Sequence, residues 1–419
     1  MLIWTLLLAC SSTPIEHPPP PDPDATPTVV GAVDGTAGEP QPQPLVILVS
    51  FDGFRADYID RYETPALDRL SGSGVRAAAL VPVFPSKTFP NHYTQVTGLY
   101  PHNHGIVGNS FFDPQTNSVF SMSSTESHWW GGEPIWVTAE KQGELAATCF
   151  WVGSEAEIQG TRPTWWLPYD GRMSDRARIE QVMAWIDLPQ RPSLITTYFS
   201  QVDSTGHSYG PATGPVEDAV TEVDDALGWL LDGLEERGLT DVADVIVVSD
   251  HGMAQLSPER LVFLDDYIDT DDPDTYILSW GAIATVDVPA GEVKSVLAAL
   301  KGAANLTCAA RAETPAHWHH SDSDRIAAVV CAADDGWSVT SRGWFEDNPN
   351  SYDGGTHGYD PTNSSMHGIF VASGPHFAQQ ASVPAFEAVE IYNMLAVALG
   401  IEAADNDGDL SRVPGVLAE

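Results

Sequence analysis

The stretch Leu45–Phe51, with the sequence LVILVSF, is continuously apolar apart from one serine and runs directly into Asp52. A run of this length and composition is typical of a strand that is buried on both faces of a parallel sheet. Two similar runs, Leu194–Phe199 and Val245–Ser249, follow it, with helical patterns between the three. This β-α-β-α-β order predicts an α/β fold built on a central sheet.

Each of these predicted strands leads to an aspartate, namely Asp52, Asp203 and Asp250. In open α/β sheets, binding sites lie outside the carboxyl ends of the strands. His207 follows Asp203 by four residues, and His251 follows Asp250 directly. Carboxylate and neutral imidazole favour zinc, iron or manganese over calcium. A single aspartate of this kind is more often a helix cap, but three at one sheet edge favour a metal site.

A further metal ligand is expected late in the chain. His357 is the candidate, because the glycines around it allow close approach of the backbone. His367 opens a strand-like segment that enters a turn, and we interpret it as structural. His317, His319 and His320 form a cluster in a polar stretch, which favours a solvated loop over a metal site.

The segment Phe84–Tyr93 (FPSKTFPNHY) contains the hydroxyl of Thr88. Alone, this threonine could simply cap a helix whose first turn contains Pro90. Beside a predicted metal site, the alternative is that the Thr88 hydroxyl attacks phosphorus. Metal coordination would stabilise the alkoxide of an otherwise poor nucleophile.

Several segments together resemble the nucleotide pyrophosphatase/phosphodiesterase family of the alkaline phosphatase superfamily. The resemblance covers roughly residues 45–410, and the motifs occur in the family's order. The matching segments are SFDGFR (50–55), TFPNHY (88–93), VTGLYP (96–101), HGIVGN (104–109), DSTGH (203–207), SDHGM (249–253) and HGY (357–359).

The resemblance implies an alkaline-phosphatase-like sandwich with a mostly parallel central sheet flanked by helices, and a site for two zinc ions. One ion would be held by Asp203, His207 and His357. The ligands of the other would be Asp52, Thr88, Asp250 and His251.

The same resemblance assigns further roles around the metals. Asn109 would stabilise a phosphate oxygen, and Phe89 and Tyr169 would stack on a nucleobase, as aromatic side chains do in other nucleotide sites. The implied reaction is hydrolysis of nucleotide phosphodiester or pyrophosphate bonds through a phospho-threonine. Sulfatases of the same superfamily use a modified cysteine or serine, so Thr88 argues against that reaction.

Two alternatives remain open at this stage. One is a choline-phosphate or phospholipid-type phosphodiesterase of the same family. The other is a lipoprotein that binds ligands without catalysis, although the complete set of predicted ligands speaks against it.

The first 44 residues differ in composition from the rest of the chain. Residues 1–10 are apolar and end in LLAC, which resembles a lipoprotein signal with lipidation at Cys10, although Lys and Arg are missing from its start. Residues 11–44 are Pro-rich and predict a disordered tether. We therefore expect an exported bacterial lipoprotein, periplasmic or at the cell surface, whose membrane contact is a lipid anchor.

Residues 45–419 are predicted to form one catalytic domain with a small α+β insertion at about 256–355. In the core, Pro215–Glu236 has an apolar stripe at helical spacing. The insertion is predicted to contain a helix at Ser257–Leu264, a strand at Ala282–Val288, a helix at Val293–Leu300 and a strand at Arg325–Ala332.

The cysteines and the net charge limit which disulfide and which partners are possible. Cys308 and Cys331 could be bridged in an oxidising compartment, whereas Cys149 lies in an apolar run and is expected to be a buried thiol. The formal charge of −39 disfavours long nucleic acid as a partner, so small phosphodiesters or nucleotides are the expected substrates. We expect the protein to be a monomer. Asp405–Asp409 lacks the spacing of a calcium loop and is interpreted as a solvated tail.

Overall fold

The computed structural model describes residues 43–418. The predicted leader, its lipidation site Cys10 and nearly all of the predicted tether lie outside the described residues. Within residues 43–418, none of the helices combines the length and the apolar character that crossing a membrane requires.

The centre of the fold is β1 (Leu45–Phe51), the strand that opened the sequence argument. It pairs in parallel with β8 (Leu194–Phe199) on one side and with β9 (Ala243–Val248) on the other. Successive β1 side chains enter two separate hydrophobic cores, with Val46 in one and Ile47 in the other. The strand is therefore apolar throughout because both of its faces are covered.

Five further strands complete an eight-stranded sheet in the order β19-β2-β18-β9-β1-β8-β6-β7. The strands beyond β8 are parallel to it, whereas β18 is antiparallel to β9 and β2 is antiparallel to β18. This mostly parallel sheet confirms the predicted fold class. The bounds of these strands are β6 Ala146–Cys149, β7 Trp165–Leu167, β18 Phe370–Ser373, β2 Val75–Ala77 and β19 Ala381–Val383.

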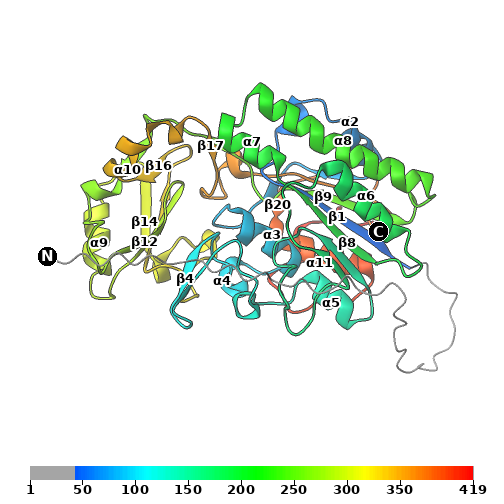
Figure 1. Ribbon diagram of the computed structural model, residues 1–419, viewed down its shortest axis with the longest axis horizontal. Helices are drawn as coiled ribbons and strands as arrows, with labels where there is room; N and C mark the ends of the chain where they lie inside the picture. The colour runs from blue at the N-terminus through cyan, green and yellow to red at the C-terminus, as the bar shows by residue number, and fades with distance from the viewer. Residues whose placement is uncertain (1–42, 419) are drawn as a thin grey trace, which may run out of the picture. The chain divides into compact units, whose positions relative to one another are not determined.

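Helices cover both faces of this sheet (Figure 1). One layer consists of α2 (Pro65–Ser73), α6 (Asp175–Ile186) and α8 (Gly214–Glu236). The opposite layer consists of α3 (Thr88–Thr97), α5 (Ile135–Lys141) and α11 (Ile391–Leu399). The predicted helix at 215–236 is present as α8, and its apolar stripe is buried at Val216, Val220, Val223, Leu227, Leu230, Leu231 and Leu234.

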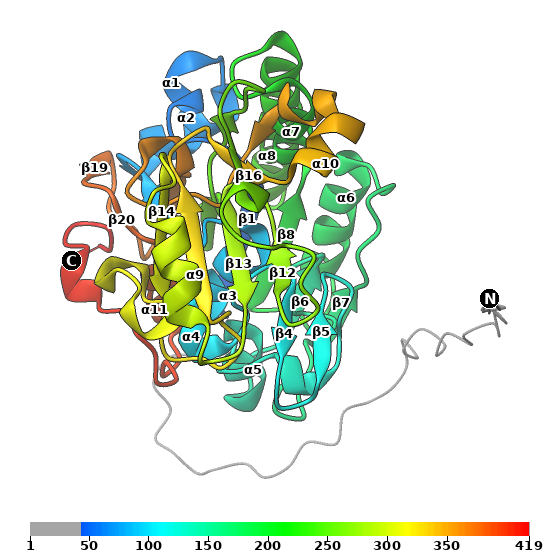
Figure 2. The same cartoon turned by 90° about the vertical axis from the view of Figure 1, so that its left-hand side faces the viewer.

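A second, antiparallel sheet lies within the predicted insertion (Figure 2). Its strands, in spatial order, are β12 (Tyr276–Ser279), β13 (Ile283–Asp287), β15 (Val329–Ala333) and β14 (Leu306–Ala310). We call these four strands the inserted sheet. The helix α9 (Val293–Leu300) packs on one of its faces and shares a small apolar core with it.

One secondary-structure prediction in the insertion is wrong. Residues 257–264 do not form a helix; instead β11 (Leu261–Phe263) pairs in parallel with β16 (Ser338–Thr340). Val262 is buried in this pairing. Pairing with a strand about 75 residues later in the sequence therefore determines the extended conformation of this segment. Local helix propensity does not predict such pairing.

The inserted sheet contains a disulfide, whereas the central sheet contains a free cysteine. Cys308 and Cys331 face each other across β14 and β15 and form a disulfide. Cys149 is a buried free thiol in β6.

Shorter elements connect these parts or flank the site. Their bounds are α1 Tyr58–Arg61, β3 Leu80–Val81, α4 Pro101–His104, β4 Phe111–Asp113, β5 Ser118–Phe120, α7 Gln201–Tyr209, β10 Ala254–Gln255, α10 Arg342–Asp347, β17 Gly355–Thr356 and β20 Phe386–Glu387.

Candidate metal centre and active site

The predicted ligands meet at the carboxyl edge of the central sheet. Asp52 directly follows β1, and Asp250 follows β9 by two residues. Asp203 is not in a strand-end loop but on α7, where His207 lies one helical turn further on. Gly53 has a φ of +69°, and a Cβ there would come within 2.8 Å of the Asp203 Cα. The turn after β1 therefore needs a glycine to let α7 approach.

Thr88 is the first residue of α3, and the cap position before it belongs to Lys87. Among residues 43–418, no side chain caps the start of this helix, so the Thr88 hydroxyl is not used as a cap. The hydroxyl lies 3.3 Å from Nε2 of His251. The capping explanation for Thr88 is therefore wrong, and its oxygen is left facing the cluster of predicted ligands.

Three histidines present the same ring atom to this cluster. In each, Nδ1 lies within hydrogen-bond distance of a backbone carbonyl, which can only accept, so Nδ1 carries the hydrogen and Nε2 keeps its lone pair. The pairs are His207 with Gly355 at 2.9 Å, His251 with Gly252 at 2.8 Å and His357 with Ser86 at 2.8 Å.

The three aspartates contribute oxygens that have no hydrogen-bond partner within residues 43–418. These buried atoms are Asp52 Oδ1, Asp203 Oδ1 and Asp250 Oδ2. Their sister oxygens on Asp52 and Asp250 are held, the first by the Tyr198 hydroxyl at 2.6 Å and the second by the Gly53 N–H at 3.1 Å. Burying an unpaired carboxylate oxygen is costly unless a cation compensates it.

The unpaired oxygens and the histidine nitrogens face one another at short range. His251 Nε2 lies 3.0 Å from Asp250 Oδ2 and 3.4 Å from Asp52 Oδ1. From Asp203 Oδ1, the Nε2 atoms of His207 and His357 lie at 3.4 and 3.6 Å. Lone pairs directed at one another in this way fit a bound cation better than they fit hydrogen bonds. The residues present therefore suit divalent metal ions.

Electrostatics lead to the same conclusion. Burial raises the pKa of Asp52 well above its usual value, and repulsion from Asp250 and Asp203 adds to this. Burial also raises the pKa of Asp203. For Asp250, burial acts to raise the pKa, but attraction to neighbouring imidazoles, His251 first, outweighs it and lowers the pKa well below its usual value. Three carboxyl groups so close together need positive charge nearby.

The spatial grouping differs from the predicted one. His251 groups with Asp203 and His357 in place of His207, and His92 joins Asp52 and Asp250 in place of His251. Two sets of side chains in the described part offer ligand atoms within 4.8 Å of one another, namely Asp203, His251, His357 and Asp52, His92, Asp250. The sequence analysis did not single out His92. It lies four residues after Thr88, one helical turn away, and this spacing is the signal that could have found it.

His92 is better suited to positioning than to metal binding. Its Nε2 lies 2.7 Å from the Ser50 hydroxyl, and its Nδ1 lies 3.0 Å from the Thr88 carbonyl. Both ring nitrogens are thus occupied, and the ring ties the start of α3 to the end of β1. This arrangement holds Thr88 in place next to the aspartates.

A cavity of about 450 Å³ extends from Thr88. Phe89 and Tyr169 both line it, and Tyr169 is 52 % exposed. Asn109 also lines it, and its Oδ1 accepts a hydrogen bond from the Phe89 N–H at 3.0 Å. That contact orients the Asn109 side chain and leaves its amide N–H groups available to a ligand.

A sequence model of the family described as "Type I phosphodiesterase / nucleotide pyrophosphatase" matches residues 46–360. The chain belongs to this family. The chain is similar to the venom phosphodiesterase CdcPDE of Crotalus durissus collilineatus, with 38% identity over 393 residues, covering 90% of this chain and 47% of the relative. Ectonucleotide pyrophosphatase/phosphodiesterase family member 3 of Rattus norvegicus is 37% identical over 380 residues, covering 87% and 43%. The chain thus spans about half the length of these relatives.

Solved structures of this phosphodiesterase family share the fold. Murine ectonucleotide pyrophosphatase/phosphodiesterase 5 superposes with a TM-score of 0.84 at 34% identity, covering 89% of this chain and all of the other. An inactive threonine-to-alanine variant of that murine protein, in complex with AMP, also gives 0.84 at 33% identity, covering 90% and 100%. These matches confirm the alkaline-phosphatase-like fold expected from the sequence.

The structure corrects the sequence interpretation of two loops, residues 317–320 and residues 405–409. The stretch around His317 to His320 is not simply a solvated loop, because His320 is only 3 % exposed and Trp318 stacks on Phe84 with ring centroids 4.0 Å apart. No metal-capable group in the described part includes these histidines. His367 has its Nε2 3.0 Å from the Pro361 carbonyl, which agrees with a structural role.

The segment Asp405–Asp409 is anchored rather than a solvated tail. The Asp407 carboxylate accepts the Tyr100 N–H at 2.8 Å, and the Asp407 N–H donates to the Gly98 carbonyl at 2.8 Å. It thereby fastens the end of the chain to the turn after α3. Nothing in its local sequence names that distant partner.

Proposed function

We propose that the protein is a two-zinc phosphodiesterase or nucleotide pyrophosphatase that hydrolyses nucleotide phosphodiester or pyrophosphate bonds through a phospho-threonine. The observation that carries this proposal is the Thr88 hydroxyl, which is uncommitted to capping and lies 3.3 Å from Nε2 of His251, among buried carboxylate oxygens without partners. A hydroxyl so placed can act as a nucleophile.

The ligand atoms support the two metal sets that the resemblance implies. Asp203, His207 and His357 would hold one ion, and Asp52, Asp250, His251 and Thr88 would hold the other. His92 is left out because both of its ring nitrogens are occupied. When bound, zinc would supply Lewis-acid stabilisation of negative charge and lower the pKa of the Thr88 hydroxyl.

The protein's own residues then account for the reaction. The Thr88 Oγ1 bonds to phosphorus as the bond to the leaving oxygen breaks. The hydroxyl proton passes to the leaving group or to solvent. Water later cleaves the phospho-threonine, which releases the nucleoside monophosphate and restores the hydroxyl. The Asn109 amide, oriented by the Phe89 N–H, would donate to a non-bridging phosphoryl oxygen.

The 450 Å³ cavity would hold the nucleoside. Phe89 and Tyr169 line this cavity and would contact the base. The AMP complex of the murine relative supports a nucleotide as the ligand. A formal charge of −39 disfavours long polyanions, so small nucleotides are the proposed substrates. The proposed active form is a monomer.

The test measures zinc content together with turnover of the p-nitrophenyl ester of thymidine 5′-monophosphate. Wild type should bind about two zinc ions, and Thr88→Ala should lose turnover by roughly 10⁴-fold or more while remaining folded. Thr88→Ser, which keeps a hydroxyl, is the matched control and should retain part of the activity.

Three outcomes would contradict the proposal in different ways. Turnover by Thr88→Ala at the wild-type rate would remove the nucleophile assignment. A folded, zinc-supplemented wild type that neither binds zinc nor turns the ester over would favour the non-catalytic binding lipoprotein, whereas zinc binding without turnover would move the substrate towards a phospholipid headgroup.

A further inference from the structure

A cavity of about 520 Å³ lies beside β16, and none of the side chains that line it carries a charge. Three of these side chains are aromatic, namely Trp280, Trp344 and Tyr352, and the serines and threonines among them are Ser338, Thr340, Ser341, Ser351 and Thr356. The chain as a whole has 58 acidic residues and a formal charge of −39. A concave site without charged groups on such a protein suits a neutral ligand.

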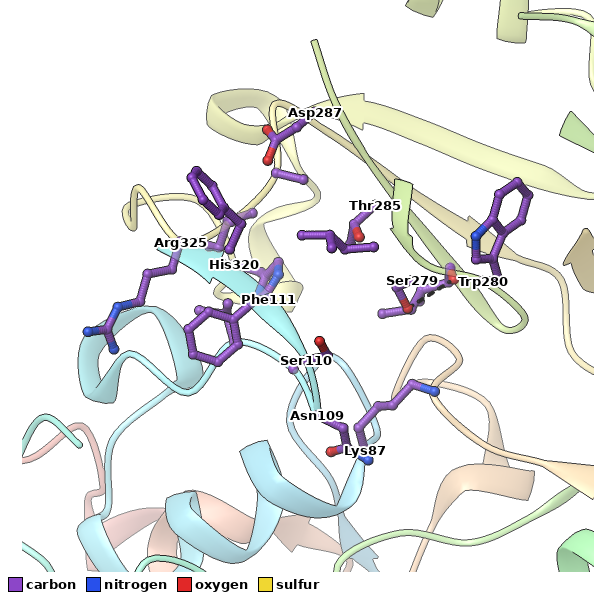
Figure 3. Close-up of a pocket in the computed structure, with 17 residues that line it drawn as sticks. Lys87, Asn109, Ser110, Phe111, Ser279, Trp280, Thr285, Asp287, His320 and Arg325 are labelled. Atoms are coloured by element: carbon purple, nitrogen blue, oxygen red, sulfur yellow. Dashed lines mark hydrogen bonds between the residues drawn. The ribbon is translucent and has the colours of Figure 1, made fainter. Parts of the chain in front are cut away.

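This cavity is close to the active site but distinct from it, since none of the proposed metal ligands lines it. Trp280 also lines a smaller cavity of about 230 Å³ that Asn109 borders. Figure 3 shows that smaller cavity, with Trp280 on the side opposite to Arg325. Thr356 lines the 520 Å³ cavity and directly precedes His357 in the chain. A ligand in the 520 Å³ cavity would therefore be held next to the metal cluster without entering it.

The turn between β12 and β13 fixes the position of Trp280. Gly281, the next residue, has a φ of +102°, in the left-handed region that favours glycine. Its N–H donates to the Val339 carbonyl at 3.0 Å, and its carbonyl accepts the Val339 N–H at 2.8 Å. These two hydrogen bonds join the inserted sheet to β16. They keep Trp280, whose side chain is 39 % exposed, at the edge of the cavity.

Trp344, on α10, provides a second exposed indole. The Ser341 hydroxyl caps α10 by accepting the Trp344 N–H at 3.2 Å. The next residue, Phe345, packs against Tyr352 with ring centroids 5.9 Å apart. The helix is thereby attached through its cap and Phe345, while Trp344 stays 56 % exposed. An exposed tryptophan on a fixed backbone offers a flat apolar face together with a polar N–H group.

The polar groups of the cavity divide into two kinds. The Tyr352 hydroxyl donates to Thr340 Oγ1 at 2.6 Å, and both residues are buried, so this pair is part of the structure. Between residues 43 and 418, the hydroxyls of Ser351 and Thr356 make no hydrogen bond, nor do the indole N–H groups of the two tryptophans. These uncharged donors and acceptors are available to a ligand that carries many hydroxyl groups.

We propose that the 520 Å³ cavity binds a short, neutral oligosaccharide whose pyranose rings stack on Trp280 and Trp344. A pyranose with mostly equatorial hydroxyls has a flat face of C–H groups, which matches an indole, and a rim of hydroxyls, which matches the free serine and threonine groups. The volume lies within the usual range of about 300–1,000 Å³ for small-ligand sites. This binding is separate from the proposed reaction and would hold the enzyme on a glycan.

A proline-rich peptide is the competing occupant, because aromatic-lined grooves also take such segments. Proline rings offer apolar surface but no hydroxyl groups, so they would leave the Ser351 and Thr356 hydroxyls unpaired. The combination of exposed indoles with free hydroxyls therefore favours the saccharide.

Titration calorimetry of the whole chain with cellotriose, a neutral trisaccharide of β-linked glucose, tests the site. Wild type should bind it with a Kd on the order of 1 mM, as expected for a few stacked rings and neutral hydrogen bonds. Trp344→Ala should weaken the binding roughly tenfold, because it removes one stacking surface. Trp344→Phe, which keeps a flat ring, should recover part of the affinity.

Tyr276→Ala is the matched control, since Tyr276 is 64 % exposed on β12 and does not line the cavity. It should leave the Kd for cellotriose unchanged. Proton NMR of the saccharide gives a second readout, because C–H groups that lie over an indole ring shift upfield. That shift should be seen with wild type and with Tyr276→Ala and be lost with Trp344→Ala, while circular dichroism shows that each variant is folded.

Three outcomes would overturn the saccharide site. They are a folded wild type that does not bind cellotriose up to about 10 mM, equal affinity of wild type and Trp344→Ala, and binding of a proline decamer that depends on Trp344 when cellotriose does not bind. The proposed reaction is tested separately, through Thr88 and the nitrophenyl ester, and none of these outcomes changes it.

Discussion

The eight-stranded sheet and the inserted sheet contribute to the site in different ways. The first is buried on both faces and places Asp52 and Asp250 at the carboxyl ends of β1 and β9. The second uses one face for its own small core with α9, and the β13 side chains of the other face line a cavity of about 230 Å³ that Asn109 also borders. The comparison indicates that the central sheet positions the proposed metal ligands, while the inserted sheet forms one wall of a neighbouring cavity.

The largest expected effect comes from the metal ligands beside the central sheet. Asp203→Asn should lower turnover of the nitrophenyl ester by roughly 10³-fold, because a lost metal ligand removes several kcal/mol of charge stabilisation. Zinc content should fall from two ions to about one. Asp218→Asn, an exposed aspartate on α8, is the matched control and should change neither quantity. Full zinc content and activity in Asp203→Asn would exclude it as a ligand.

A smaller effect is expected from the disulfide of the inserted sheet. Replacing both Cys308 and Cys331 by serine opens a loop with a sequence separation of 23 residues and should destabilise this sheet by about 3 kcal/mol. Faster amide hydrogen exchange in β14 and β15 is the measurement, and wild type in reductant should reproduce it. Hydrolysis of the nitrophenyl ester should persist at the wild-type rate, since the central sheet is untouched. Loss of that activity would mean that ester hydrolysis depends on the inserted sheet as well as on the central sheet.

Aromatic contacts in the cavity proposed for the nucleoside should have a smaller effect. Tyr169→Ala should raise KM for the thymidine ester roughly tenfold, because base stacking contributes about 1–3 kcal/mol per base. Hydrolysis of bis-p-nitrophenyl phosphate, which has no nucleoside, should not change. Tyr276→Ala, an exposed tyrosine on the inserted sheet, is the control and should leave the thymidine KM as it is. An equal effect of Tyr169→Ala on both substrates would argue against stacking.

The smallest expected effect is a change in the pH dependence of folding stability, which arises from the buried His320. Burial lowers the pKa of His320 to about 3, and the repulsion of His102 adds to this. The unfolded chain takes up the proton near pH 6.5 and the folded chain does not, so stability is lost as the pH falls from about 6.5 towards 3. At pH 5.5 this amounts to about 1.4 kcal/mol.

Urea unfolding at pH 7.5 and pH 5.5 measures that effect. In His320→Gln the loss of stability between these two pH values should be smaller than in wild type by about 1.4 kcal/mol. An unchanged pH dependence would mean that the imidazole can be protonated within the folded protein.

Much of the fold and of the metal cluster could be predicted from local sequence. The runs at 45–51, 194–199 and 245–249 are apolar because these strands are buried on both faces, and such burial leaves a continuous signature. The seven predicted ligand residues do converge at one sheet edge, because ligands that follow strand ends are brought together by the parallel sheet itself. Asp203 differs only in its local setting, since it lies on α7.

What the sequence missed depends on partners far along the chain. His92, the buried ring of His320 and the anchor at Asp407 are each held by residues outside their own segments. The same is true of β11, whose strand state comes from pairing with β16. Local patterns carry no information about such distant partners, so these positions were overlooked or misassigned. Only His92 had a local signal, its spacing of four residues from Thr88.

The sequence alone determined the α/β class, the nucleophile candidate and the chemical type of the metal ligands, because strand burial and ligand chemistry are properties of short segments. Only the tertiary structure decided which atoms of those ligands are free. The Nε2 atoms of the three histidines and the unpaired aspartate oxygens depend on backbone contacts such as that of His357 with Ser86. It also decided that Asn109 borders two cavities, since one wall of the second cavity comes from strands about 170 residues later in the chain.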